Sequence, residues 1–389
     1  MEKVFGIDIG NAKTEIAYRE NGEIEFVRQP SVISHLPRTP ESTDMGTDQI
    51  IENLYDNLTV HISSPAIKRN GDYYVGKKAM QHDGIKTNMM ISLGGKSTHD
   101  LPLITSLSLV AAKALKDSYN KGESLEKSID VNLKLATAIP SSEYSKQSAK
   151  NLEDRFNGKH LVTLYIGEEH VLVTIKIEHC KVTEEGRTAM LAFLDSENDI
   201  LKDFINGYKD KDKSIPRETK DFKNARTLHV DIGDGTSEFV VIEGVNPVQG
   251  LSKGKRLGVG HASDLAISLL KDQINISDKF TRQQLQEWLK RKNEKGQLAR
   301  DLMKEATFGQ AQTILEEIQL SYQELASSDV DYIFVHGGGS ITFRPDLEEE
   351  LKIFAENNRF KIVWIPKKYA TTMNSRGTFH LANLIFNKN

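Results

Sequence analysis

Residues 5–16 read Phe-Gly-Ile-Asp-Ile-Gly-Asn-Ala-Lys-Thr-Glu-Ile, and residues 228–239 read Leu-His-Val-Asp-Ile-Gly-Asp-Gly-Thr-Ser-Glu-Phe. Each segment is an apolar run that ends in Asp-Ile-Gly, passes through small and hydroxyl residues, and returns to an apolar run after Glu. This pattern predicts a strand, a tight turn and a second strand. The two copies correspond at four pairs of positions: Asp8 with Asp231, Gly10 with Gly233, Lys13 with Thr236, and Glu15 with Glu238. One Asp-x-Gly hairpin is usually only a turn, but two copies matched over their whole length favour a shared function.

The composition of these turns favours phosphate binding. Small residues let backbone N–H groups approach a polyphosphate, and a carboxylate beside them can hold a hydrated Mg²⁺. We therefore predict two phosphate-gripping hairpins that face each other across a cleft, with Asp8 and Asp231 holding the metal between them.

Length and composition restrict the class of protein. A chain of 389 residues exceeds the size of one hydrophobic core, so two domains are expected, and the repeated hairpin predicts two related halves. Hydrophobic residues at 38%, charged residues at 27% and a net charge of -4 describe an ordinary soluble protein without bulk attraction to DNA or anionic lipid. The single cysteine, Cys180, excludes an intrachain disulfide and a zinc site built from cysteines.

The sequence shows no targeting or membrane segment. No run approaches the apolar length of a membrane span, and the N-terminus enters the first predicted strand without a signal-peptide pattern. We expect a protein that is not exported, that works in the reducing cytoplasm and that has no contact with a membrane. Residues 379–386, a short stretch that is apolar on one side, are predicted to form a packed terminal helix rather than a lipid anchor.

Several elements are predicted between the two hairpins. Asn70-Gly71, in front of two tyrosines, predicts the type I′ turn of a further hairpin within residues 66–76. Apolar residues in helical spacing predict a helix over residues 101–117, and apolar runs predict strands over residues 131–140, 161–166 and 171–177. Residues 195–224 are rich in Asp and Lys, and we expect a solvated connection there with one short helix around residues 200–205.

An acidic pair also lies between the two hairpins in sequence. Glu184 and Glu185 precede Gly186 and a predicted helical run over residues 187–193. A carboxylate at such a helix start can orient the water that attacks a γ-phosphate, and it can equally cap the helix by interacting with the helix dipole. The sequence leaves both roles open, and Glu185 is the stronger catalytic candidate of the two acids.

A run of three glycines follows a predicted buried strand further along the chain. The strand ends at His336, and Gly337, Gly338 and Gly339 then precede Ser340. Because glycine lets the backbone approach a flat ligand closely, this turn suits a base and ribose. A crowded turn at a sheet edge is the alternative interpretation.

Taken in this order, the motifs resemble those of the actin-like ATPase superfamily. Residues 8–15 resemble its first phosphate loop, residues 231–238 its second phosphate loop, and residues 336–340 its adenosine loop. Residues 184–186 and 374–377 are similar to its two connecting elements. Within the superfamily, residues 72–79, Asp-Tyr-Tyr-Val-Gly-Lys-Lys-Ala, and the lack of an appended domain resemble the ParM-type plasmid-segregation actins.

The resemblance implies an α/β, actin-like fold. It would comprise two related domains, each with a mixed sheet and helices, with the nucleotide in the cleft between them. Domain I would span residues 1–194 with an inserted subdomain at about 30–117, and domain II would span residues 195–372 with an inserted helical subdomain at about 261–325. Residues 373–389 would form a C-terminal helix that returns to domain I.

The resemblance also implies the ligands and the site residues. Asp8 and Asp231 would hold Mg²⁺, and Glu185 would orient the attacking water. The remaining residues that would bind ATP lie in three loops: Gly10, Asn11, Ala12 and Lys13; Gly233, Asp234, Gly235 and Thr236; and Gly337, Gly338, Gly339 and Ser340.

The implied function is an ATPase that polymerises into filaments with ATP and segregates plasmid DNA through a DNA-binding adaptor protein. Contact with the plasmid would then be only indirect. Two other classes of protein share the two hairpins. A small-molecule kinase would need a separate catalytic Asp, for which the sequence offers no convincing candidate. A client-binding ATPase of the heat-shock type would need an appended client domain, for which we expect no room.

Overall fold

The computed structural model describes residues 2–40, 45–88, 95–125, 128–195, 199–208, 215–216, 218–278 and 280–387. The chain divides into two compact units. Unit 1 comprises Met1–Ala192 and Asn374–Asn389, and unit 2 comprises Phe193–Met373. None of the helices described in these ranges is long and apolar enough to cross a lipid bilayer.

Unit 1 is built on a ten-stranded mixed sheet with the order β3-β2-β1-β8-β10-β9-β5-β6-β4-β7. Its first five strands are β3 (Glu23–Pro30), β2 (Lys13–Glu20), β1 (Glu2–Ile9), β8 (Ile129–Ile139) and β10 (Glu169–Glu184). The strand β1 pairs antiparallel with β2 and parallel with β8, and β8 pairs parallel with β10. This arrangement confirms the first predicted hairpin and the predicted strand over residues 131–140.

The other strands extend the sheet of unit 1. They are β9 (Gly158–Ile166), β5 (Thr59–Ser63), β6 (Gly71–Val75), β4 (Val32–Leu36) and β7 (Thr87–Asn88). The shorter helices of this unit are α1 (Thr47–Glu52), η1 (Leu54–Asp56), α2 (Lys77–Gln81) and α4 (Lys146–Phe156). The predicted strands over residues 161–166 and 171–177 are confirmed as the antiparallel pair of β9 and β10.

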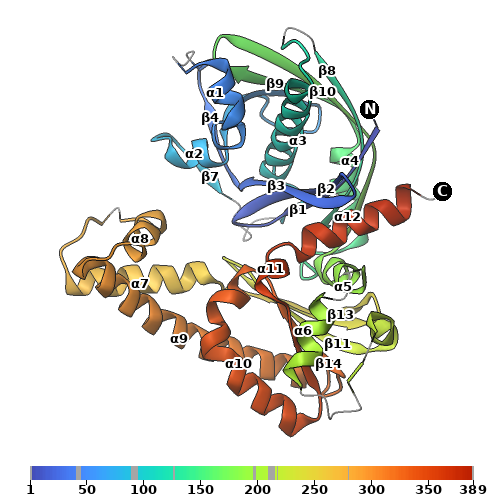
Figure 1. The fold of residues 1–389 in the computed structure, drawn as a ribbon, viewed down its shortest axis with the longest axis vertical. Helices are drawn as coiled ribbons and strands as arrows, with labels where there is room; N and C mark the ends of the chain where they lie inside the picture. Colours follow the sequence, from blue (N-terminus) through green and yellow to red (C-terminus); the bar gives the residue numbers. More distant parts are fainter. Residues whose placement is uncertain are drawn as a thin grey trace. The chain divides into compact units, whose positions relative to one another are not determined.

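The helix α3 (Leu101–Asn120) is the centre of the core of unit 1. It confirms the helix predicted over residues 101–117, and buried residues lie on all sides of it. It contacts β3 and β4 as well as β9 and β10, and Figure 1 shows it inside the curve of the sheet. A helix that is apolar all round has no face for solvent, so the sheet encloses it.

One predicted turn in unit 1 is wrong. Strand β6 begins at Gly71 and pairs with β5, so the hairpin exists, but its first strand ends at Ser63 rather than beside Asn70. The side chain of Asn70 accepts a hydrogen bond from the N–H of Ser64 at 2.8 Å. This bond closes a longer loop, and Pro65 within it interrupts the strand pattern.

Unit 2 repeats the central arrangement of unit 1. Its five strands have the order β13 (Asn246–Lys255), β12 (Ser237–Glu243), β11 (Arg226–Ile232), β14 (Tyr332–His336) and β15 (Lys361–Trp364). The strand β11 pairs antiparallel with β12 and parallel with β14, and β14 pairs parallel with β15. Strand order and strand directions therefore match those of β3-β2-β1-β8-β10, which confirms the prediction of two related halves.

Most of the remaining helices belong to unit 2, and two lie where the chain passes from one unit to the other. Unit 2 contains α6 (Asp199–Gly207), η2 (Thr219–Asn224), α7 (Val259–Gln273), α8 (Arg282–Leu289), α9 (Glu294–Glu324), α10 (Gly338–Asn358) and α11 (Lys367–Ala370). Two further helices are α5 (Glu185–Asp195), in which the boundary between the units falls, and the terminal α12 (Met373–Phe386). The helices α7 and α8 both pack on the long α9 (Figure 1).

The charged connection over residues 195–224 is less solvated than predicted. The expected short helix is confirmed as α6, while residues 196–198, 209–214 and 217 lie outside the described residues. Phe222 in η2 is fully buried, and its ring lies 4.8 Å from that of Phe193 and 5.9 Å from that of Phe334. One aromatic residue thus anchors a segment whose charges predicted exposure.

The helices α5 and α12 cross closely within unit 1. A Cβ atom at Gly377 of α12 would lie only 1.8 Å from the carbonyl oxygen of Thr188 in α5. No side chain fits at that distance, so the crossing requires glycine. The crossing also fixes residues 374–377 against the start of α5, which carries Glu185.

We therefore expect the substitution Gly377→Ala to destabilise unit 1 by about 1–3 kcal/mol, because the added methyl group forces the two helices apart. Thermal unfolding monitored by circular dichroism would show a Tm lower by several degrees. Gly46→Ala is the matched control, since its φ is -61° and no atom lies within 4 Å of the new Cβ. Equal melting temperatures for the two variants would contradict the close crossing.

Candidate functional site

The turn of the first hairpin is held from behind by neighbouring hydroxyl groups. Gly10 N–H donates to Lys13 O at 2.8 Å and closes the turn. Ser31 donates its hydroxyl to Gly10 O at 2.7 Å and its backbone N–H to Ala12 O at 3.0 Å. Thr14 lies beside Ser31, with 3.0 Å between the two hydroxyl oxygens. The turn is therefore a rigid loop whose carbonyl groups bond to protein.

The turn of the second hairpin has the same geometry but a different support. Gly233 N–H donates to Thr236 O at 2.8 Å. The first amides of α7 support this turn: Val259 N–H donates to Gly233 O at 3.3 Å, and Gly260 N–H donates to Asp234 O at 2.8 Å. The N-terminus of α7 is thus used to hold the loop.

The two hairpins agree in register as well as in sequence. Asp8 lies opposite Glu15 across the first hairpin, and Asp231 lies opposite Glu238 across the second. Each aspartate is the second-last residue of a central strand. The structure therefore places both predicted aspartates at equivalent points of two equivalent sheets.

Asp8 lies at a position in unit 1 where a negative charge is unfavourable. Burial, together with the nearby Glu185 carboxylate, raises the pKa of its carboxyl group to about 7. The Lys96 and Lys13 ammonium groups act in the opposite direction but do not restore the ordinary value. Asp8 is thus a carboxylate that would gain from a further positive charge nearby.

Glu185, the predicted water-orienting residue, begins α5 and is paired with a buried lysine. Lys96 Nζ lies 2.5 Å from Glu185 Oε1, and the two side chains are only 4% and 12% exposed. Burial alone would lower the pKa of Lys96, but the carboxylates of Glu185 and Asp8 outweigh it and leave the pKa raised. Asp8, Glu185 and Lys96 therefore form one charge cluster in unit 1.

The start of α12 joins this cluster to the first hairpin. Ser375 donates its hydroxyl to Glu15 Oε1 at 2.6 Å. Thr188, one turn into α5, donates to the backbone oxygen of Glu185 and to Asn374 Oδ1 at 3.0 Å. Both predicted connecting elements thus meet within unit 1.

Lys13, predicted to hold phosphate, also contacts Glu15. Its Nζ lies 2.8 Å from Glu15 Oε2, and the same oxygen is 3.0 Å from Nε of Arg28. Glu15 itself is fully buried. The lysine is therefore fixed along the hairpin, with 29% of its side chain exposed.

The three glycines of unit 2 lie directly against the second hairpin. Gly337 has a φ of +87°, and a Cβ there would lie 2.3 Å from Asp231 Oδ1. A Cβ at Gly339 would lie 2.6 Å from Ile232 Cγ2, whereas at Gly338 the nearest atom would be 3.8 Å away. Ser340 is buried and donates to Gly337 O at 2.7 Å. Two of the glycines are thus explained by packing on the hairpin, and Gly338 is the exposed one.

The other predicted residues of unit 2 lie around the turn. The Asp234 side chain is 45% exposed, with Oδ2 3.5 Å from Arg282 Nη1. Gly235 O lies 3.1 Å from Nε2 of His261. Thr236 is partly exposed at the end of the turn. Unit 2 therefore brings together Asp231, the turn and the glycine run, whereas unit 1 brings together Asp8, its turn and Glu185.

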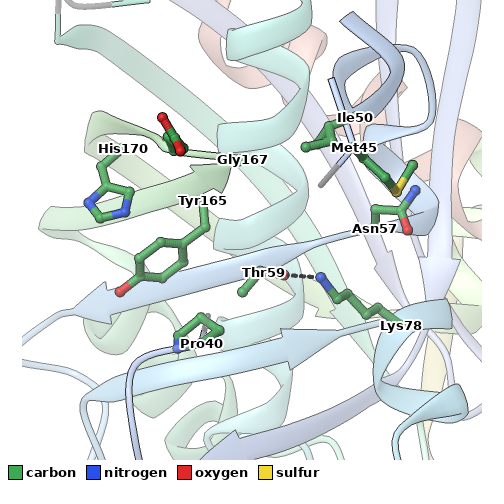
Figure 2. Close-up of a pocket in the computed structure, with 10 residues that line it drawn as sticks. Pro40, Met45, Ile50, Asn57, Thr59, Lys78, Tyr165, Gly167 and His170 are labelled. Atoms are coloured by element: carbon green, nitrogen blue, oxygen red, sulfur yellow. Dashed lines mark hydrogen bonds between the residues drawn. The ribbon is translucent and has the colours of Figure 1, made fainter. Parts of the chain in front are cut away.

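A separate cavity of about 410 Å³ lies in unit 1, where the inserted part meets the turn between β9 and β10 (Figure 2). It is lined by Pro40, Met45, Ile50, Asn57, Thr59, Lys78, Tyr165, Gly167, Glu168 and His170. Lys78 Nζ donates to Thr59 Oγ1 at 2.6 Å, and burial lowers the pKa of this lysine. The residues predicted from the sequence do not line this cavity, so it is distinct from the hairpin site.

Lys96 is the charged member of the cluster that the sequence did not reveal. Its segment, Gly95-Lys96-Ser97, resembles the end of a P-loop, but Met90 stands where that motif requires its first glycine. This incomplete motif is the feature of the sequence that could have pointed to Lys96. Lys96 pairs with Glu185, which lies 89 positions further along the chain, and no periodic sequence pattern links residues so far apart.

Comparisons with known proteins agree with this geometry. Residues 6–187 match the family profile described as the N-terminal domain of actin-like proteins. No curated protein sequence matches the chain significantly. Three similar solved structures are Bacillus thuringiensis ParM with ATP (19% identity, 100% of each chain, TM-score 0.65), the actin-like protein Alp7A (17% identity, 100% of this chain and 98% of that chain, TM-score 0.70), and Ta0583, an archaeal actin homolog (18% identity, 99% of this chain and 100% of that chain, TM-score 0.64).

The chain therefore has an actin-like fold, with two mixed sheets of related topology and a matched hairpin in each. Its first part, residues 6–187, is similar to the N-terminal domain of actin-like proteins. Within this class the chain is similar to the ParM and Alp7A proteins over its whole length. The resemblance inferred from the sequence motifs is confirmed at the level of the fold.

The raised pKa of Asp8 predicts a pH dependence of stability in the nucleotide-free protein. Because the pKa rises from 3.8 to about 7 on folding, the stability that this group contributes is present below pH 3.8 and is lost as the pH rises through about 7. Asp8→Asn cannot ionise. Its Tm relative to wild type should therefore increase by a few degrees between about pH 5 and about pH 8. A difference that stays constant over this range would contradict the assignment.

A second prediction concerns the glycine that packs on Asp231. Gly337→Ala places a methyl group against the carboxylate at a φ that alanine rarely adopts, so we expect a loss of about 1–3 kcal/mol in unfolding free energy. Urea denaturation would measure it. Gly338→Ala is the control, since the atom nearest to its new Cβ lies 3.8 Å away, an ordinary van der Waals contact, and it should unfold close to the wild type. Equal losses in the two variants would count against the packing described here.

Proposed function

We propose that this protein is an ATPase that polymerises into filaments with ATP and segregates plasmid DNA through a DNA-binding adaptor protein. The observation that carries the proposal is the matched register of the two hairpins on two sheets of the same topology. Two equivalent glycine turns, each beside an aspartate, suit the two sides of one polyphosphate. That Bacillus thuringiensis ParM has been solved with ATP, with ADP and with AMPPNP supports ATP as the ligand.

The residues present fit a magnesium ion that arrives with the nucleotide. Within the described ranges, no three His, Cys, Asp or Glu side chains gather closely enough to hold a metal ion by themselves. Mg²⁺ usually keeps several waters and binds through one or two carboxylates together with phosphate oxygens. Asp8, which burial deprives of solvent, suits that role, and we propose Asp231 as its counterpart.

The turn residues would bind the phosphates through their backbone. In the first hairpin, Ser31 holds the carbonyl groups of Gly10 and Ala12, which leaves ligand contacts to the amide side of the turn. Asn11 Oδ1 is buried and has no hydrogen-bond partner within the part of the chain that the structure describes. Such an orphaned acceptor is costly unless a ligand or its waters complete it. We assign Gly10–Lys13 and Gly233–Thr236 to the phosphates.

Glu185 would orient the attacking water. It occupies the first position of α5, within the charge cluster that includes Asp8. A carboxylate there can accept a hydrogen bond from the water and take its proton as the phosphoryl group transfers. The run Gly337–Ser340 at the start of α10 would hold the adenosine, with the exposed Gly338 as the position of closest approach.

Hydrolysis would control the lifetime of the filament. A change in the phosphate state of the bound nucleotide would change the conformation of the protein, and so the surfaces that neighbouring subunits share. Filaments need subunit contacts that do not close into rings. We propose that the protein works in the cytoplasm and that it contacts DNA only through the adaptor protein.

Light scattering and pelleting of the purified protein test the proposal. We expect assembly with Mg-ATP and none without nucleotide. Glu185→Gln should slow phosphate release by about 100-fold or more and prolong the life of the polymer, because the water loses its base while nucleotide binding remains.

Glu184→Gln is the matched control, since Glu184 is the adjacent acid but ends β10 rather than beginning α5. It should assemble and hydrolyse like the wild type. If the wild type binds ATP but fails to assemble over a range of salt and protein concentrations, the proposal that it forms filaments is refuted. Phosphate release stimulated by a sugar would instead support a small-molecule kinase.

A further inference from the structure

Lys96 is one of two lysines that are buried within the described ranges, the other being Lys113. An ammonium group loses its hydration on burial, which is unfavourable unless charged partners replace the water. Lys113 has its partners on its own helix and on β2, with Nζ close to Asp117 and 3.7 Å from Glu20 Oε1. Lys96 instead reaches from a loop to the start of another helix, where the candidate catalytic acid lies.

The loop that carries Lys96 is fixed by two polar side chains. Lys96 N–H donates to Glu143 Oε2 at 3.0 Å. Arg155 Nη1 donates to Ser97 O at 3.1 Å and to His99 O at 2.7 Å. Both polar residues belong to unit 1 and lie outside the hairpin. The backbone around Lys96 is therefore held independently of its ammonium group, and the direction of the side chain is a property of the fold.

The Lys96 ammonium group is paired with the Glu185 carboxylate and interacts electrostatically with the carboxylates of Asp8 and Glu143. Its Nζ lies 2.5 Å from Glu185 Oε1, and its charge also acts on Asp8. Buried ion pairs contribute little net stability compared with apolar residues of the same size. An ion pair placed beside a candidate metal-binding carboxylate is therefore better explained by what it does to Glu185 than by stability.

From this geometry we infer that Lys96 is a positioning residue for ATP hydrolysis: it holds the Glu185 carboxylate, through Oε1, in the orientation that aligns the attacking water. The inference rests on the proposed ATPase function. Without Lys96, Glu185 would be a partly buried carboxylate beside Asp8, and like charges would drive its side chain out of place. Lys96 itself forms no bond and transfers no proton in the reaction.

A double-mutant cycle tests the inference. Lys96→Met keeps the length of the side chain and removes the charge, and we expect it to lower kcat for ATP hydrolysis by about 10-fold to 100-fold with KM within about 3-fold of wild type. In a Glu185→Gln background, the same substitution should change kcat by less than about 2-fold, because Lys96 acts only through Glu185. Lys96→Arg should recover part of the rate, since it restores the charge.

Lys113→Met is the control for the loss of a buried lysine in the same unit. It should lower Tm at least as much as Lys96→Met while leaving kcat unchanged. Three results would overturn the inference: equal kcat for Lys96→Met and wild type, a full loss of rate that persists in the Glu185→Gln background, or a selective loss of affinity for AMPPNP over ADP, which would make Lys96 a phosphate ligand.

The design separates this inference from the proposed function. AMPPNP binding, measured by calorimetry on wild type and Lys96→Met, does not depend on turnover. A wild type that neither binds nor hydrolyses ATP would refute the proposed function itself. A wild type that hydrolyses ATP, beside a Lys96→Met variant with unchanged kcat, would refute only the positioning role.

Discussion

The turn hydrogen bond is the constraint on which the candidate site depends. Gly10 N–H to Lys13 O and Gly233 N–H to Thr236 O, both 2.8 Å, close two loops of the same size. Each bond fixes the register of its hairpin, and that register sets Asp8 and Asp231 at the ends of central strands. A slip of one residue would turn each aspartate to the opposite face of its sheet. The equivalent positions of the two aspartates in the candidate site are therefore a consequence of turn geometry.

Unit 1 keeps a charge arrangement that stability alone would not select. Burial and repulsion from Glu185 together raise the pKa of Asp8, and Lys96 and Lys13 offset only part of this effect. Proteins depart from locally favourable arrangements mainly at functional sites. A metal-bound nucleotide would supply the missing positive charge, so under the proposed function the unfavourable charges of the free protein become a source of ligand affinity.

The sequence predicted those features that are local in the chain. Hairpins, the helix α3 and the strand β8 follow from turn residues and apolar periodicity, and these predictions are confirmed. The error at Asn70 arose because a side-chain hydrogen bond to Ser64 competes with the expected turn. The burial of Phe222 and the role of Lys96 were not predicted for a different reason. Each residue contacts partners that are distant in the sequence, and no spacing pattern in a single sequence indicates such contacts.

The two halves share a topology but differ in what supports the turn, and under the proposed function this difference suits them to different roles. In unit 1, side-chain hydroxyl groups hold the turn, and Lys96 and Glu185 form an ion pair near Asp8. In unit 2, the first amides of α7 hold the turn, and glycines pack against Asp231. Charged side chains suit proton transfer, whereas close-packed backbone suits recognition of a flat base. Under the proposed function, the two halves thus carry equivalent phosphate hairpins, and the elements around them differ: those in unit 1 suit hydrolysis and those in unit 2 suit nucleoside binding.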